Sequence, residues 1–104
     1  MSKAVTDQNF KQEVLQSSTP VVVKFFATEC GACKTMAPIF NELASEMSNC
    51  SFVEYNIDNS RESAVKMNIA SVPTFIVIKN GSEVGRANGS MSKEDLKSKI
   101  EACL

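Results

Sequence analysis

The feature that most restricts the fold is a nearly continuous apolar run from Val21 to Ala27, which follows Pro20. β-Branched and aromatic residues fill this run, and Lys24 is its single charged member. A strand that does not alternate between apolar and polar residues is typical of a sheet covered by helices on both faces. The run therefore predicts a central strand of an α/β protein.

Helical and strand-like patterns alternate along the rest of the chain. The pair Asn80-Gly81 favours a tight hairpin, because both residues tolerate positive φ angles. The predicted order is β-α-β-α-β-α-β-β-α, a central mixed β-sheet flanked by helices on both faces, with the opening strand not assigned to residues. No repeat or linker interrupts the 104 residues, so one domain over 1–104 is expected. The predicted helices run from Thr6 or Asp7 to Leu15, from Cys30 to Met47, from about Ser60 to Met67 and from Ser92 to Leu104; the other strands run over 51–57, 75–78 and 83–87.

Composition excludes several classes of function. The net charge is −1, with Lys and Arg scattered along the chain, so the basic face that nucleic acids require is not expected. No apolar stretch reaches the ~20 residues needed to cross a bilayer, and the first residues are polar, unlike a signal peptide. A cytoplasmic protein with no nucleic-acid or membrane partner is therefore expected. The lack of His also excludes catalysis by Cys–His or Ser–His–Asp arrangements.

A Cys30-Gly31-Ala32-Cys33 motif lies where the central strand ends and a helix is predicted to begin. The thiolate is the nucleophile of disulfide exchange, and the free N–H groups and dipole of a helix N-terminus stabilise this anion. The i, i+3 spacing places both sulfurs on one side of the first turn, within reach of a disulfide. One cysteine can then attack a target disulfide and the other can resolve the mixed disulfide. Gly31 leaves the backbone bare for a protein substrate.

A Cys-X-X-Cys pair is also half of a common zinc site. Zinc needs two further ligands, and only Cys50 and Cys103 are available as thiolates. These two are isolated from each other in the sequence, so no metal site is predicted. Each is interpreted as an incidental thiol, with regulatory or dimer-forming oxidation as the alternative.

The chain resembles the thioredoxin family. The resemblance rests on the Cys-Gly-Ala-Cys-Lys stretch and the strand before it, on Val72-Pro73-Thr74-Phe75 about 40 residues later, and on the Asn-Gly hairpin, in that order. It implies that Cys30 is the exposed nucleophile, that Cys33 is the buried resolving cysteine, and that Pro73 is a cis-proline facing them. It further implies a groove in which substrate pairs with the backbone at Val72. The residues expected to bind substrate are Glu29, Gly31, Ala32, Val72, Pro73, Thr74 and Gly89.

Three positions depart from the family pattern. Glu29 stands where Trp usually precedes the first cysteine, and its carboxylate disfavours a neighbouring thiolate. Ala32 replaces the usual Pro, which frees a backbone N–H and loosens the turn. Lys24 aligns with the family's buried acid and Glu54 with its usual lysine, so we expect an exchanged ion pair beneath the motif, with Glu54 accepting the Cys33 proton. The alternative is that both side chains turn outward as unrelated surface charges.

The resemblance implies a protein-disulfide reductase that cycles between a Cys30/Cys33 dithiol and a disulfide. Its expected partners are disulfide-containing protein substrates and an electron donor of the thioredoxin-reductase type. No bound cofactor is expected, because the sequence lacks a Gly-rich dinucleotide fingerprint. Two alternatives remain: a thioredoxin-fold oxidant or isomerase, and a redox-inactive binding module.

Overall fold

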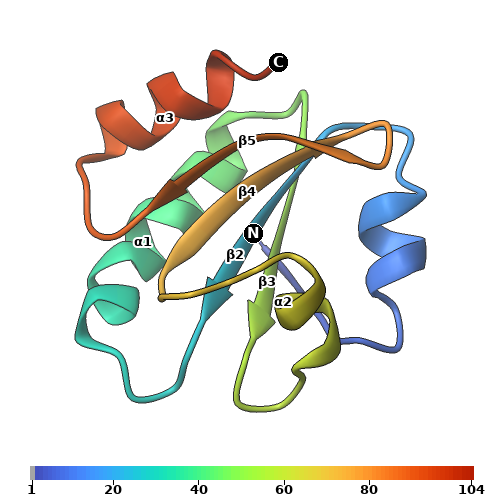
Figure 1. Ribbon diagram of the computed structural model, residues 1–104. Coiled ribbons are helices and arrows are strands. Elements are labelled where there is room, and N and C mark those ends of the chain that lie inside the picture. The colour runs from blue at the N-terminus through green and yellow to red at the C-terminus, as the bar shows by residue number, and fades with distance from the viewer. Residues whose placement is uncertain (1) are drawn as a thin grey trace.

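The computed structural model describes residues 2–104, and Figure 1 shows a central sheet with helices on both faces. The order of elements along the chain agrees with the predicted order. The elements are β1 (Lys3–Val5), η1 (Lys11–Leu15), β2 (Val21–Phe26), α1 (Gly31–Glu46), β3 (Ser51–Asn56), α2 (Glu62–Lys66), β4 (Thr74–Lys79), β5 (Ser82–Asn88) and α3 (Lys93–Glu101).

The five strands lie in the order β1-β3-β2-β4-β5, which places β2 at the centre. β2 runs parallel to β3 and antiparallel to β4, so the sheet is mixed, as predicted. In the parallel register, Lys24 of β2 lies beside Glu54 of β3. The two charged positions therefore meet inside the sheet because their strands are neighbours.

Helices cover both faces of β2, which explains why its sequence does not alternate. Val21, Val23 and Phe25 pack into a core that includes side chains of η1 and α2. Val22 packs on the opposite face, in a second core built with α1 and α3. Successive side chains of a strand point to opposite faces, so Lys24 shares the α1 face with Val22.

The β4–β5 connection confirms the predicted hairpin. Lys79 pairs with Ser82, and the two residues between them, Asn80 and Gly81, have φ angles of 53° and 79°. Positive φ at both central positions matches the right-handed twist of the flanking strands. Asn and Gly adopt this conformation with little strain, which is why the sequence signal was reliable here.

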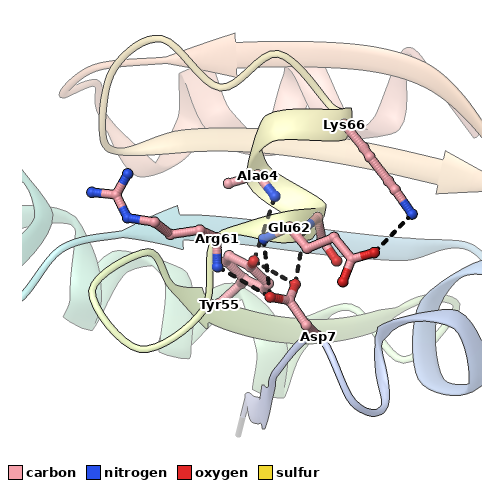
Figure 2. Close-up of polar contacts among 7 residues, drawn as sticks. Asp7, Tyr55, Arg61, Glu62, Ala64 and Lys66 are labelled. Carbon is pink, nitrogen blue, oxygen red and sulfur yellow. Dashed lines mark hydrogen bonds and ion pairs between the residues drawn. The ribbon is translucent and has the colours of Figure 1, made fainter.

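The first helix differs from its prediction. It was expected to start at a cap supplied by Thr6 or Asp7, but η1 is a short π-helix that begins at Lys11 and has no side-chain cap. The Asp7 carboxylate instead accepts hydrogen bonds from three backbone N–H groups at the start of α2, from Arg61, Glu62 and Ser63 at 2.9–3.1 Å. Tyr55 Oη donates a further bond to Asp7 at 2.7 Å (Figure 2). Asp7 therefore caps a helix more than 50 residues away.

The last helix confirms its predicted start. Ser92 precedes α3, and its hydroxyl accepts a hydrogen bond from the Asp95 N–H at 3.1 Å. Of the helices in residues 2–104, none has the length and apolar character that crossing a membrane requires.

Candidate active site

Cys30 and Cys33 lie at the junction between β2 and α1 and form a disulfide. Their Cα atoms are 5.2 Å apart, inside the usual range for a disulfide. Cys30 is the N-cap of α1, and its sulfur accepts a hydrogen bond from the Cys33 N–H at 3.1 Å. An N–H of the first helical turn thus points at the Cys30 sulfur, where it would also stabilise a thiolate.

The two sulfurs differ in accessibility. Cys30 is half-buried, whereas only 4% of Cys33 is exposed. Gly31 is exposed, and a Cβ placed there would meet no atom within 4 Å. The space beside the motif is therefore open to a second molecule, and Cys30 is the sulfur that such a molecule reaches.

The Pro73 segment faces the dithiol. The Val72–Pro73 peptide bond is cis, as the family resemblance implied, and the Val72 carbonyl oxygen lies 3.9 Å from Cys30 Sγ. Gly89 donates its N–H to the Pro73 carbonyl at 2.9 Å, which brings the end of β5 to the same place. Thr74 is buried and donates its hydroxyl to the Ser71 carbonyl at 2.7 Å, so it positions the loop and offers a substrate no exposed side chain.

Lys24 and Glu54 form an ion pair beneath the motif, with Lys24 Nζ 3.5 Å from Glu54 Oε2. Only 4% of the Lys24 side chain is exposed, against 30% of the Glu54 side chain. The ammonium also lies 5.0 Å from the ring centroid of Phe26 and 5.1 Å from that of Phe40. Cation–π contacts of this kind offset part of the cost of burying the charge. The exchanged pair that the family resemblance implied is present, and the outward-turned alternative is wrong for Lys24.

A cleft of about 450 Å³ connects this pair to the dithiol. Lys24, Glu54 and Cys33 all line it, together with polar side chains of Thr28, Lys34, Asn41 and Asn56. The volume of the cleft is large enough to hold water molecules, and the Glu54 carboxylate and the Cys33 sulfur both border it. The arrangement can therefore carry a proton between the resolving cysteine and a carboxylate.

Sequence reasoning missed Asn41, which lines this cleft, and Ser2, which contacts both Asn41 and Glu54. The Ser2 hydroxyl lies 2.9 Å from Glu54 Oε2 and 3.1 Å from Asn41 Oδ1. It donates to the carboxylate and so helps to fix its orientation. No motif could have found this contact, because Ser2, Asn41 and Glu54 come from three distant segments that only the fold brings together.

The remaining cysteines lie away from the dithiol motif in the sequence. Cys50 is buried, and burial raises the pKa of its thiol. Cys103 is half-buried and donates to the Lys99 carbonyl at 3.2 Å. Within residues 2–104, no group of three or more His, Cys, Asp or Glu side chains is arranged to hold a metal ion.

The thioredoxin family model matches residues 1–102. The chain belongs to the thioredoxin family. It is 38% identical to thioredoxin 1 of Synechococcus elongatus over 102 residues, which cover 97% of this chain and 95% of the relative. It is 39% identical to thioredoxin of Mycobacterium bovis over 93 residues, 88% of this chain and 80% of the relative.

A further relative joins two activities in one chain. The bifunctional thioredoxin reductase/thioredoxin of Mycobacterium leprae is 40% identical over 93 residues, which cover 88% of this chain but 20% of the relative. Family membership and the Cys30–Cys33 disulfide together make the protein a thiol–disulfide oxidoreductase whose redox group is a disulfide of its own chain.

Proposed function

We propose that this single-domain thioredoxin reduces disulfides of protein substrates in the cytoplasm and is returned to its dithiol form by a reductase of the thioredoxin-reductase type. The observation that carries the proposal is the unequal pair of sulfurs at the start of α1, with Cys30 accessible and Cys33 buried. The fused reductase of the Mycobacterium leprae relative supports the choice of electron donor. The free thiols of Cys50 and Cys103 fit a reducing compartment.

In the first step, the Cys30 thiolate attacks one sulfur of the substrate disulfide. The substrate S–S bond breaks, one substrate sulfur leaves as a thiolate, and the other becomes bonded to Cys30. The Cys33 N–H, 3.1 Å from Cys30 Sγ, stabilises the attacking anion. Substrate backbone pairs with Val72 beside the dithiol, and Gly31, Ala32, Pro73 and Gly89 border the same groove.

In the second step, Cys33 loses its proton and attacks Cys30 Sγ. The mixed disulfide breaks, the second substrate thiolate leaves, and the Cys30–Cys33 disulfide forms, so two electrons have passed to the substrate. Glu54 accepts the Cys33 proton through water in the shared cleft. Lys24 acts through Glu54 as a positioning residue, because its buried ammonium holds the carboxylate at the edge of the cleft.

Trapping with cysteine variants tests the roles of the two sulfurs. Cys33→Ser should attack a protein disulfide such as that of insulin and stop as a stable mixed disulfide, because no second thiol resolves it. Cys30→Ser should form no such adduct at a comparable rate. Equal trapping by both variants would contradict the assignment.

Redox equilibration with glutathione separates a reductase from an oxidant of the same fold. A strongly reducing potential together with insulin reduction supports the proposal. A potential in the range of disulfide-forming oxidants, about 90 mV or more above that of typical thioredoxins, would instead favour the oxidant or isomerase. A dithiol that equilibrates with glutathione but reduces no protein would instead favour the binding module.

A further inference from the structure

We propose that Glu29 makes this protein selective for substrate disulfides that have basic side chains beside them; this inference rests on the reductase function proposed above. The observation is an exposed carboxylate, held by an anchored loop, at the residue directly before the attacking cysteine. The substrate class is therefore cationic disulfide segments rather than protein disulfides in general.

The loop that carries Glu29 is fixed on both sides. On one side, the Thr28 N–H donates to Asp58 Oδ2 at 2.8 Å, and Asn56 Nδ2 donates to Thr28 Oγ1 at 3.2 Å. On the other side, Cys30 is the N-cap of α1. The backbone at position 29 is therefore held between two fixed neighbours, and the Glu29 side chain extends from the residue directly before Cys30.

The charge of Glu29 is available to a partner. No ion pair or side-chain hydrogen bond joins its carboxylate to another side chain among residues 2–104. Asp58, which is also acidic, lies in the loop that anchors Thr28 and adds charge of the same sign. Lys34, by contrast, lines the cleft with Cys33. The two carboxylates are therefore associated with the loop that precedes Cys30, whereas Lys34 lies on the α1 side of the motif.

A substrate cannot avoid this charge, because its own sulfur must reach Cys30. The residues next to that sulfur then come within a few ångströms of position 29. An exposed ion pair at such a distance changes kcat/KM by about 3-fold, and exchanging a basic for an acidic neighbour changes it by about 10-fold. The preference is electrostatic and so weakens as salt shortens the screening length.

The test uses three disulfide peptides that differ only in the residue next to the target cysteine, which is Lys, Gln or Glu. The measured quantity is kcat/KM for reduction of each peptide, with native protein, Glu29→Gln and Glu29→Lys. Ratios between peptides are compared within each variant, because any change in Cys30 reactivity then cancels. Glu101→Gln, an exposed position at the far end of α3 (Figure 1), is the control for net charge.

The proposal expects the native protein and Glu101→Gln to prefer the Lys peptide over the Glu peptide by about 10-fold at low salt, falling toward unity in about 0.5 M salt. Glu29→Gln should bring the peptides within about twofold of one another, and Glu29→Lys should reverse their order. Reduction of all three peptides at equal kcat/KM by the native protein, or a preference for the Lys peptide that survives in Glu29→Gln, overturns the inference and leaves the reductase function intact. Failure to reduce any peptide overturns both.

Discussion

The carboxylates of Asp7 and Glu54 both contact residues of the central sheet, but their surroundings differ. Asp7 is bonded to Tyr55 and to three N–H groups at the start of α2, at distances of 2.7–3.1 Å (Figure 2). Glu54 is held by Lys24 at 3.5 Å and by Ser2, and it lines an open cleft beside Cys33. A carboxylate whose oxygens are fully bonded stabilises a fold, whereas one that keeps access to water can also accept a proton.

The electrostatics of the Asp7 network follow from its contacts. Burial alone raises the pKa of Asp7, but the hydrogen bonds from Tyr55, Ser63 and Glu62 outweigh it and hold the pKa well below its usual range. Burial, followed by the bond to Asp7, raises the pKa of Tyr55 to about 12. The two groups therefore stabilise the fold when Asp7 is charged and Tyr55 is neutral.

The largest expected effect comes from breaking the Asp7 network. Asp7→Asn should lower the free energy of unfolding by about 2 kcal/mol, because it removes charge-assisted bonds at a helix start. Both steps of disulfide exchange should keep their native rates. Urea unfolding measures the loss, and Asp95→Asn, an exposed carboxylate in the first turn of α3, is the matched control.

The same variant should change the pH dependence of stability. The folded pKa of Asp7 lies below its unfolded value of 3.8, so its contribution is complete above that pH and is lost as the pH falls toward the folded pKa. Asp7→Asn should therefore lose less stability between about pH 5 and pH 2 than the native protein does. If the free energy of unfolding fell equally in the two proteins over this pH range, Asp7 would not titrate in this way.

Tyr55 reports on the network directly, because it is the only tyrosine and the chain has no Trp. Absorbance titration of the native protein should give a pKa of about 12, against an ordinary value of 10. In Asp7→Asn the value should fall but stay above 10, because burial, the larger cause, remains. With the raised pKa, this contribution to stability is complete below pH 10 and is lost as the pH rises through 12.

A smaller effect is expected where Lys24 is replaced by Met. The apolar Met side chain still fills the space between Phe26 and Phe40, and the Glu54 carboxylate that loses its cation is 30% exposed to water, so the free energy of unfolding should change by less than about 1 kcal/mol. Resolution of the mixed disulfide should slow by about 5-fold, because Glu54 loses the cation that positions it. A large loss of stability with unchanged resolution would make Lys24 structural, like Asp7.

The smallest effect is expected at Ser2. Ser2→Ala removes the hydroxyl that donates to Glu54 and should slow resolution by about 2- to 3-fold, whereas Ser2→Thr, which keeps the hydroxyl, should restore it. Stopped-flow measurement of mixed-disulfide decay against pH distinguishes a role in orienting Glu54 from a structural role. Only the proton-transfer step should respond to the loss of the hydroxyl. Identical pH profiles for Ser2→Ala, Ser2→Thr and the native protein would show that Ser2 has no part in the proton transfer.

The sequence predicted one of these two regions and missed the other. Lys24 and Glu54 lie inside strong strand patterns, and the resemblance to the thioredoxin family placed those strands side by side and so predicted the pair. The dithiol was equally visible, because strand, motif and helix are contiguous. Asp7 was misassigned to the nearest helix, since a cap that acts across more than 50 residues leaves no local signal. Strand β1 was not assigned for a different reason, because three residues are too few to show a periodicity.

The measurement that tests the account most directly compares the two steps of exchange in Glu54→Gln. Attack is followed as formation of the mixed disulfide in a Cys33→Ser background, and resolution as its decay with Cys33 present. If Glu54 accepts the Cys33 proton, attack should stay within about 3-fold of native while resolution slows by about 10- to 100-fold. Resolution at the native rate, or an equal loss in both steps, would contradict the role of Glu54 and leave the Lys24–Glu54 pair as a structural feature only.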